Sequence, residues 1–367
     1  MVDLSIHVLN SGVGESVVVG LPNGKWGVVD CYASNLEDPS SNHTLNFLRK
    51  QGVTDLEFLC LTHPHFDHYR GLSHLFGNFK IRSFWRFGAF ASHDLKRILL
   101  KYVKTSATAS ADPELLEDAD ELTRSLAESL RKKQAGEISD IFFLSDVKHL
   151  YPLPRGSEGD LEIKSIAPSS NNIARYQEEL HKCFDNQGRL VDELPFQRHN
   201  DVSAAISIRY GNARVILCGD VEIKNWNDTQ RFLPADEFKA NGVKVSHHGS
   251  TTGYTPDLWA RFAAAQKPYA IVTPFRRFGL PKKEALEHIR TNTTVLMTTC
   301  RAATLEGEAH DFLFSRPRGL RTQAFLRGRF KGWIDYEPPK SVGICSMVFK
   351  EDGTCRHWCS GDACELT

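Results

Sequence analysis

The sequence predicts an α/β fold class, and three features of the chain predict it. Short apolar runs typical of strands fill the first eighty residues, and a second series of such runs follows residue 160. In both series a helix-like stretch accompanies the strands, which is the combination expected of an α/β protein. The chain has 367 residues, 41% hydrophobic and 25% charged, so it matches ordinary globular proteins rather than disordered or coiled-coil ones.

The first series contains four predicted strands and one predicted helix. The turn-forming Pro22-Asn23-Gly24 separates two of the apolar runs. The strands are predicted at residues 4–9, 16–20, 26–29 and 56–61, and the helix near 44–50.

A helical pattern occupies the chain between the two series, from about residue 92 to 136. Asp112 and Pro113 are suited to cap and open a helix, and apolar residues then recur at helical spacing at Leu115, Ala119, Leu122, Leu126 and Leu130. We interpret residues 86–158 as a helical insertion. Two roles stay open for it, a packing hairpin and a lid over a functional site.

The second series predicts strands at 161–166, 203–209, 214–218, 243–245 and 270–273, and a helix near 281–290. Composition changes after Cys300, where basic residues gather without an acidic one between Arg316 and Lys331, followed by several cysteines. We therefore predict a main domain over residues 1–300 and a basic, cysteine-containing C-terminal extension over 301–367.

Charge and cysteine content exclude some classes of protein. Lys and Arg total 45 and Asp and Glu total 45, so no overall charge attracts the chain to nucleic acid or lipid, and any basic site must be local. No apolar run approaches the ~20 residues of a membrane helix, and the first residues lack a signal-peptide pattern, so we expect no membrane association. The nine cysteines include Cys31, Cys60 and Cys218 in or beside apolar runs. Buried thiols of this kind favour a reducing, cytoplasmic location.

The strongest chemical signal is the stretch Thr62-His63-Pro64-His65-Phe66-Asp67-His68, which directly follows a predicted strand. Side chains alternate in an extended segment, so His63, His65 and Asp67 point to one side, and a turn after Asp67 brings His68 to a second metal. The competing interpretation, a loop of surface histidines, leaves this density of metal-binding side chains unexplained.

Three other predicted strands end in polar residues. Asp220 follows the run 215–218 and a glycine, His247 and His248 follow the run 243–245, and Asp30 follows the run 26–29. Open α/β sheets bind ligands beyond the carboxyl ends of their strands, so these ends are expected to converge on one site. Asp30 has two interpretations, a turn residue or an indirect support for a histidine ligand.

These residues resemble the metallo-β-lactamase superfamily, whose His-x-His-x-Asp-His signature stands here at residues 63–68, with Asp30 and Asp220 at the positions of its other acidic motifs. Residues 217–222, 247–250 and 200–203 are similar to the branch that contains the nuclease-like domain of bacterial competence proteins. The resemblance covers about residues 4–300 without the insertion, and it implies a four-layer αββα sandwich.

The resemblance also implies roles for the individual residues. His63 and His65 hold one metal ion, Asp67 and His68 hold another, Asp220 bridges both, and His247 or His248 completes the second. Two such ions share a hydroxide and stabilise charge on a phosphoryl or carbonyl oxygen. We take His247 as the ligand, and His248, Asp67 and an indirectly acting Asp30 as the catalytic group, although the sequence leaves open which of the two histidines binds metal.

Two departures from the family pattern bear on the site. The superfamily often has a further histidine ligand near the position of His199. The competence branch has an asparagine there instead, which Asn200 matches, so His199 remains an uncertain ligand. The branch has Gly-His-Pro where this chain has Gly279-Leu280-Pro281. Arg276, Arg277 and Lys282 are then the candidates for supplying positive charge beside a phosphate.

The expected cofactors are two divalent ions. Imidazole ligands favour zinc, and the carboxylates also admit manganese. The basic stretch 316–331, with Phe325, Phe330 and Trp333, suits a nucleic-acid strand, the alternative being a solvated loop. For Cys355, His357, Cys359 and Cys364 the alternatives are a small zinc site and free thiols on a hairpin.

The sequence therefore predicts a dinuclear metal-dependent phosphodiesterase, first of all a nuclease. Two alternatives remain, a hydrolase of a small phosphodiester or other ester, and a non-catalytic, metal-stabilised subunit of a larger assembly with a protein partner.

Overall fold

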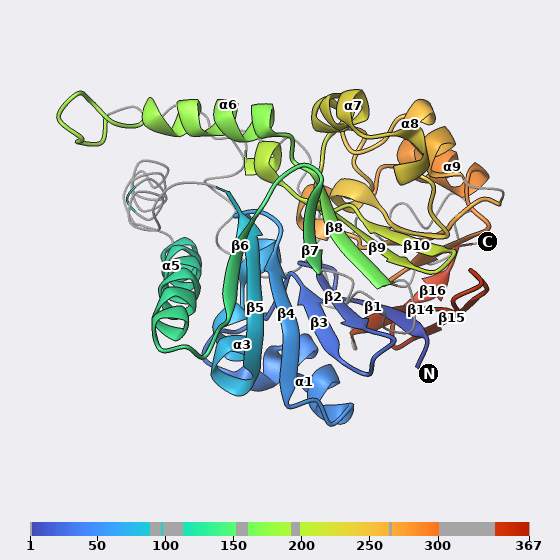
Figure 1. Cartoon of the computed structure of the whole chain (residues 1–367), viewed down its shortest axis with the longest axis horizontal. Helices are drawn as coiled ribbons and strands as arrows, with labels where there is room; N and C mark the ends of the chain where they lie inside the picture. Colours follow the sequence, from blue (N-terminus) through green and yellow to red (C-terminus); the bar gives the residue numbers. More distant parts are fainter. Residues whose placement is uncertain are drawn as a thin grey trace.

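Two eight-stranded sheets form the centre of the protein (Figure 1). The computed structural model describes residues 2–88, 97, 113–151, 161–191, 199–263, 266–300 and 342–366. The chain builds most of the first sheet before it enters the second, and it returns to both sheets at its C-terminal end.

The first sheet combines antiparallel and parallel strands. Its strands are β1 (Leu4–Asn10), β2 (Ser16–Gly20), β3 (Trp26–Val29), β4 (Asp55–Leu61), β5 (Lys80–Phe87), β6 (Asp140–Leu144), β14 (Gly343–Phe349) and β15 (Cys355–Ser360). Their order is β15-β14-β1-β2-β3-β4-β5-β6. The strands from β3 to β6 run parallel, so their carboxyl ends lie at one edge of the sheet.

The second sheet repeats this plan. Its strands are β7 (Lys148–Tyr151), β8 (Leu161–Ala167), β9 (Ala205–Tyr210), β10 (Ala213–Leu217), β11 (Gly242–Lys244), β12 (Tyr269–Val272), β13 (Val295–Thr298) and β16 (Cys364–Glu365). Their order is β16-β13-β12-β11-β10-β9-β8-β7. The strands from β10 to β13 run parallel and end at a common edge.

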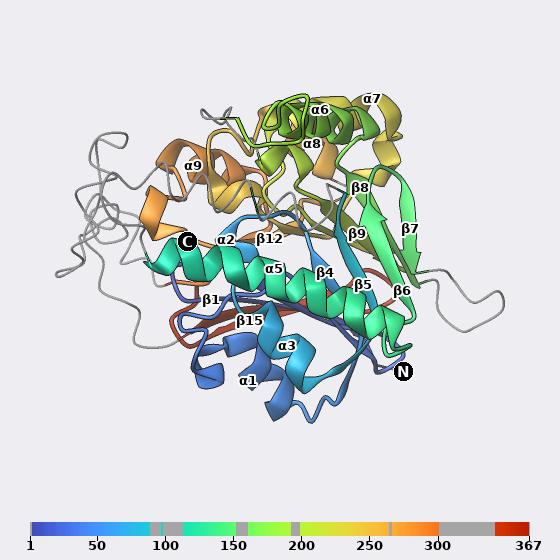
Figure 2. The same cartoon turned by 90° about the vertical axis from the view of Figure 1, so that its left-hand side faces the viewer.

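Helices flank the two sheets on their outer sides (Figures 1 and 2). The α-helices are α1 (His43–Lys50), α2 (Phe66–Tyr69), α3 (Leu72–Asn78), α5 (Pro113–Gln134), α6 (Ser170–His181), α7 (Ile223–Phe232), α8 (Pro256–Phe262) and α9 (Lys283–Thr291). The short 3-10 helices are η1 (Pro39–Ser41), η2 (His199–Val202), η3 (Ala235–Glu237), η4 (Ser246–Gly249) and η5 (Arg276–Phe278). None of the described helices has the length and apolar composition needed to cross a membrane.

Three apolar clusters show that the elements form four layers. One cluster lies between the sheets and joins residues of both, among them Phe58 and Ile206. A second fills the space between the first sheet and its helices, with Leu75 of α3 and Leu126 of α5, and a third does so under α7, α8 and α9 with Trp259. Burial of apolar side chains on both faces of each sheet is the main force that holds the layers together. The expected αββα sandwich is confirmed.

The predicted elements of both series are present, with ends shifted by one or two residues. The predicted helix near 44–50 is α1, and the one near 281–290 is α9. The sequence pattern did not predict β5, α6, α7 or α8. In α6 and α7 the apolar residues recur at helical spacing but are few among polar neighbours, as at Tyr176 and Leu180 of α6 and Trp226 of α7.

The segment expected to be a helical insertion contains more than helix. Pro113 begins α5 as predicted, and Glu121 of α5 accepts hydrogen bonds from the backbone N–H groups of Gly71 and Ser73 at the start of α3. Within the same segment, β6 pairs with β5 and β7 pairs with β8. Residues 140–151 thus extend both sheets, because their backbone groups continue the two hydrogen-bond ladders. Residues 89–96 and 98–112 lie outside the described part.

The region beyond residue 300 also belongs partly to the sandwich. β14 pairs with β1 over seven residues and β16 pairs with β13, so residues 343–365 complete the two sheets rather than form a separate extension. The hairpin of β14 and β15 carries Cys355 and Cys359 as free thiols, and the described residues show no metal-binding group there. The basic stretch 316–331 lies outside the described residues.

Candidate metal centre

The polar residues that end the parallel strands meet at the edge where the two sheets face each other. Asp30 follows β3, and the His63–His68 motif follows β4 and enters α2. Asp220 follows β10, and His247 and His248 lie in η4 directly after β11. The convergence expected from the sequence is therefore present, and each side chain comes from a loop fastened to a buried strand.

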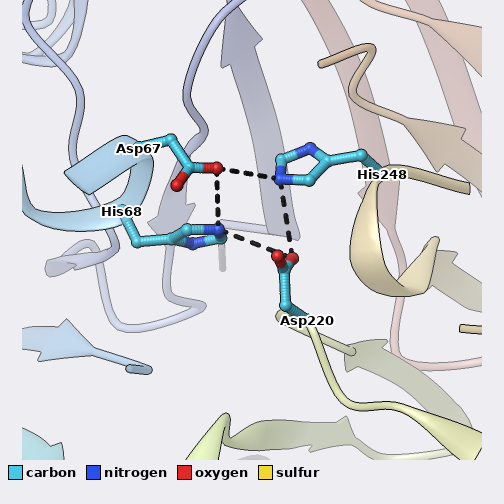
Figure 3. Close-up of side chains that lie close together, drawn as sticks. All are labelled: Asp67, His68, Asp220 and His248. Carbon is cyan, nitrogen blue, oxygen red and sulfur yellow. Dashed lines mark hydrogen bonds and ion pairs between the residues drawn. The ribbon is translucent and has the colours of Figure 1, made fainter. Parts of the chain in front are cut away.

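One group of four side chains is completely enclosed (Figure 3). Asp67, His68, Asp220 and His248 are all buried, and their potential ligand atoms lie within 4.8 Å of one another. His248 Nε2 is 3.1 Å from Asp67 Oδ2 and 3.6 Å from Asp220 Oδ1. His68 Nε2 is 3.4 Å from Asp67 Oδ2 and 3.5 Å from Asp220 Oδ1. Two carboxylates and two imidazole nitrogens thus surround one point.

A second group shares Asp220 with the first. His63, His65 and Asp220 place their potential ligand atoms within 4.8 Å of one another. His63 Nε2 is 3.0 Å from His65 Nδ1 and 3.9 Å from Asp220 Oδ2. Asp220 therefore turns Oδ1 toward the first group and Oδ2 toward the second, which is the geometry of a bridging carboxylate.

The donor set fits divalent metal ions. Within the described part of the chain, His68 Nε2 and Asp220 Oδ1 are buried without a hydrogen-bond partner, a costly state that a shared cation relieves. Burial alone would raise the pKa of Asp67, but the surrounding imidazoles hold it well below its usual range. Burial and the neighbouring His68 and His65 lower the pKa of His63, which keeps this imidazole neutral, as metal binding requires. The fold type and this cluster together imply bound divalent ions.

The remote nitrogens of the histidines are held by other groups. His68 Nδ1 is 2.7 Å from Asp30 Oδ2, and Asp30 also accepts hydrogen bonds from Thr62 N at 2.8 Å and Thr62 Oγ1 at 2.7 Å. Thr62 Oγ1 lies 3.0 Å from His63 Nδ1. A partner on the remote nitrogen fixes the ring and the nitrogen that faces the metal. This geometry agrees with an indirect role for Asp30, which supports the ligand His68. A residue that only formed the turn after β3 would not need these contacts.

Backbone conformation at the site is unusual. Asp30, His247 and His248 have φ values of 58°, 47° and 51°, in the left-handed region that side chains with a Cβ rarely adopt. Such residues cost about 1–3 kcal/mol each and persist where surrounding contacts hold them. Of the four described non-glycine residues with positive φ, three therefore lie at this one site.

The two adjacent histidines of η4 have different surroundings. His248 is buried and faces Asp67 and Asp220, whereas the His247 side chain is 20% exposed. His247 Nδ1 lies 3.3 Å from Glu222 Oε1 and 3.0 Å from Thr252 Oγ1, and its Nε2 is 3.9 Å from Asp220 Oδ2. The arrangement favours the reverse of the assignment made from sequence, with His248 among the ligands and His247 at the rim, because the left-handed turn directs the second histidine inward.

His199 lies beside the second group without joining it. Its ring centroid is 5.3 Å from that of His65, and its Nδ1 is 2.6 Å from the hydroxyl of Tyr176 in α6. Burial, with a smaller effect of His65, lowers the pKa of His199 to about 3. Asn200 is adjacent and lies 3.4 Å from His247 Nε2. Both residues thus border the site from η2.

The segment with Gly279-Leu280-Pro281 packs behind the site. Lys282 donates its backbone N–H to Gly249 at 2.9 Å, so this segment supports the turn that follows His248. Arg276 is buried, and its backbone N–H donates to the carbonyl of Gly12 at 3.0 Å. The structure does not describe the side chain of Arg277.

Sequence reasoning missed five residues that contact the site: Glu15, Thr273, Lys244, Glu222 and Tyr176. A signal was available for Lys244, because a lysine inside the short apolar run 243–245 must find a charged partner when that strand is buried. Glu222 lies in the stretch 217–222 that carries the resemblance, although no role was assigned to it. Tyr176 has no such signal, because it lies in a surface-like stretch.

The fold and the buried cluster together define a metal-binding protein of the αββα sandwich type. Residues 13–87 match the sequence profile of the family described as the metallo-beta-lactamase superfamily. This segment includes Asp30 and the whole 63–68 motif, so it carries the part of the site that the superfamily signature describes. The sandwich is the metallo-β-lactamase fold.

Comparison with solved structures gives distant likenesses. A diphosphatase of the PhnP family has a TM-score of 0.35 at 9% identity, covering 74% of this chain and 86% of that one. Zn-bound PqqB from Methylobacterium extorquens has a TM-score of 0.29 at 12% identity, covering 64% of this chain and 61% of that one. A long-form RNase Z from yeast has a TM-score of 0.36 at 11% identity, covering 75% of this chain and 38% of that one.

The chain thus spans less than two thirds of the length of PqqB and of RNase Z. Likenesses this distant do not indicate a substrate. No curated protein sequence matches the chain. The resemblance to competence proteins stays a prediction.

Proposed function

We propose that the protein is a dinuclear metal-dependent hydrolase that cleaves phosphodiester bonds, with nucleic acid as the first candidate substrate. The observation that carries the proposal is the shared carboxylate of Asp220, which turns one oxygen to each of two groups of ligand atoms. Two divalent ions held there, zinc or manganese, would activate a water and stabilise charge on the phosphoryl oxygens.

The protein's own residues divide into three tasks. His63 and His65 would hold one ion, and Asp67, His68 and His248 would hold the other, with Asp220 common to both groups. Asp30 orients His68. His247 stands at the rim, where Glu222 and Asp220 raise its pKa against the opposing effect of burial. A protonated imidazole in this place is suited to donate a proton to the leaving oxygen.

A second candidate is a small phosphodiester or another ester. It is favoured by a groove of about 520 Å³ that borders His247 through Glu222 and Thr252. Its other lining residues carry both signs of charge: Lys224, Arg231 and Asp228 of α7. Mixed charge in a groove of this size suits a small ligand better than a long phosphate backbone.

The test is an assay of purified protein, with zinc or manganese added, on single- and double-stranded DNA, RNA and a chromogenic phosphodiester. Cleavage of a nucleic acid that falls steeply with salt supports the nuclease. Cleavage of the chromogenic ester alone supports the second candidate. A protein that binds two ions and cleaves none of these substrates contradicts the phosphodiesterase and favours a metal-stabilised subunit.

The basic stretch separates the two substrates further. In the nuclease, Arg327→Ala with Arg329→Ala weakens binding to a nucleic-acid strand and flattens its salt dependence, while hydrolysis of the chromogenic ester is unchanged. Equal loss on both substrates would show that the stretch supports folding. Unchanged activity on both substrates would show that the stretch is a solvated loop.

A further inference from the structure

A buried ion pair lies directly behind the metal centre. Glu15, in the loop before β2, is 2% exposed and Lys244 of β11 is 0% exposed, and Lys244 Nζ contacts Glu15 Oε2. Burying two charges is costly, and the pair is not used by the proposed chemistry. Lys244 holds its proton, because Glu15 and Asp220 raise its pKa although burial alone would lower it. The cost of burying Glu15 and Lys244 indicates that the pair contributes to the structure around the metal centre.

Glu15 connects the two sheets at the site. Its backbone N–H donates to the carbonyl of Asp67 at 2.9 Å, and its carboxylate accepts a hydrogen bond from Thr273 Oγ1 at 2.7 Å. Thr273 follows β12, and both its Oγ1 and its carbonyl oxygen lie beside His248 Nδ1, at 3.0 and 2.9 Å. Glu15 thus reaches the remote nitrogen of His248 through one hydroxyl.

Lys244 connects the pair to Asp220. Its ammonium donates to the carbonyl of Gly219 at 3.2 Å, and the same carbonyl accepts the backbone N–H of His247 at 3.0 Å. The Gly219 carbonyl therefore joins the loop before Asp220 to the left-handed turn of His247 and His248, and Lys244 also donates to it. Both carry ligands that sequence places far from the 63–68 motif.

The pair is not a third metal site, although Glu15, Asp30 and His68 also lie within 4.8 Å of one another. The Lys244 ammonium already supplies the positive charge beside Glu15. His68 Nδ1 faces Asp30, so this nitrogen is engaged as well.

We propose that Glu15, neutralised by Lys244, is a positioning residue that acts through Thr273 to aim His248 Nε2 at the ion held with Asp67, His68 and Asp220. The arrangement parallels that of Asp30 with His68, with a threonine hydroxyl inserted between carboxylate and imidazole. This inference rests on the proposed metal centre and names residues that control one of its two ions.

The decisive variant is Thr273→Val, which removes the hydroxyl but keeps a side chain of similar shape and leaves the backbone carbonyl in place. The readout is the affinity of the purified protein for zinc, measured by competition with a chromophoric chelator, together with the melting temperature of the metal-free protein. We expect one of the two ions to bind about 10–100-fold more weakly, which is typical for loss of a group behind a ligand. The other ion and the melting temperature of the metal-free protein stay close to the parent's.

Thr229→Val is the matched control. Thr229 of α7 is also buried, 2% exposed, but its hydroxyl has no hydrogen-bond partner among the residues that the structure describes. This variant is expected to bind both ions as the parent does. Equal weakening in both threonine variants would show a general packing effect and overturn the proposal.

The carboxylate is tested with Glu15→Ala combined with Lys244→Met, which leaves no unpaired buried charge. This double variant is expected to weaken the same ion as Thr273→Val, and adding Thr273→Val to it should weaken that ion little further, because all three changes break one connection. Independent, additive losses would contradict the connection through Thr273.

The outcomes separate the positioning role from the proposed function. Unchanged affinity for both ions in Thr273→Val, in a protein whose parent binds two ions and hydrolyses a phosphodiester, overturns the positioning role alone. A parent that binds two ions without hydrolysis overturns the proposed function, and the affinities still decide the positioning role. A parent that binds no ion overturns both.

Discussion

The two sheets contribute to the metal centre in different ways. The loop after β4 in the first sheet supplies four candidate ligands within six residues, His63, His65, Asp67 and His68. The second sheet supplies Asp220 from one loop and His248 from another, with His199 and Asn200 in a third. The first contribution is a continuous motif, and the second is assembled only when parallel strands end side by side.

The contributions of the two sheets are stabilised by different kinds of contact. The motif of the first sheet is stabilised locally, by Thr62 and by Asp30 of the neighbouring strand. The ligands of the second sheet rely on long-range contacts: the turn of His247 and His248 has left-handed backbone and is tied to Gly219, Thr273 and Glu15. Changes in the second sheet are therefore expected to reveal how the two contributions are coupled.

The largest effect is expected at the residue that joins the two contributions. Asp220→Ala removes a carboxylate from both ligand groups, so metal content should fall well below the parent's and hydrolysis should fall by about a thousandfold or more, ~4 kcal/mol of barrier. Elemental analysis, circular dichroism and rates on a chromogenic phosphodiester measure this, with His65→Ala as a one-group comparison. A folded Asp220→Ala protein that keeps activity within about tenfold of the parent would show that the carboxylate is not the bridge.

The two histidines of η4 are expected to have different roles within the second sheet's contribution to the site. His248→Ala should lose one of two ions, because the ring faces Asp67 and Asp220. His247→Ala should keep both ions and lower kcat by about a hundredfold, through loss of a proton donor. Metal content and pH–rate profiles of both variants test this, and loss of metal from the His247 variant alone would restore the assignment made from sequence.

A smaller effect is expected behind the motif of the first sheet. Asp30→Asn keeps the shape of the side chain but replaces the charge beside His68 Nδ1, so the affinity for one ion should fall about 10–100-fold. Zinc competition measures it. An Asp30→Asn protein with unchanged affinity for both ions would mean that Asp30 only shapes the turn after β3.

His199 decides whether a third loop of the second sheet belongs to the site. The His199 ring borders that of His65 and is held by Tyr176 at Nδ1, so we expect His199→Ala to loosen the group of His63 and His65 and weaken one ion about tenfold. Asn200→Ala is the adjacent control and should leave both ions bound. Full metal occupancy with unchanged affinity in His199→Ala would remove His199 from the site.

A first-sheet histidine outside the site is expected to change folding stability rather than metal binding, and only in acid. Burial lowers the pKa of His7 in β1 to about 4, against 6.5 for an unburied histidine. The unfolded chain therefore takes up this proton first, so stability is complete above pH 6.5 and falls by about 2–3 kcal/mol as the pH drops toward 4. Urea unfolding of metal-free protein and of His7→Gln should show a smaller fall in the variant. Parallel pH curves for the two proteins would contradict this.

Much of the architecture follows from local pattern. Alternating or continuous apolar runs predicted the strands around Val18, Leu59, Ile163 and Ile216, because a strand buried on both faces must be apolar along its length. Strands at the ends of the sheets were harder to predict. β6 and β15 are half exposed, and their sequences carry a weak signal.

By itself the sequence determined the α/β class, the motif of residues 63–68 and the polar residues that end β3, β10 and β11, because backbone periodicity and metal-ligand chemistry are local properties of the chain. The tertiary structure decided what depends on contacts between distant segments. It placed residues 343–365 inside the two sheets, turned His248 rather than His247 toward Asp67, and set Glu15 against Lys244 and Thr273. Asp67 and His248, 181 positions apart, meet only because the edges of the two sheets face each other, and no local pattern encodes which side chain then points inward.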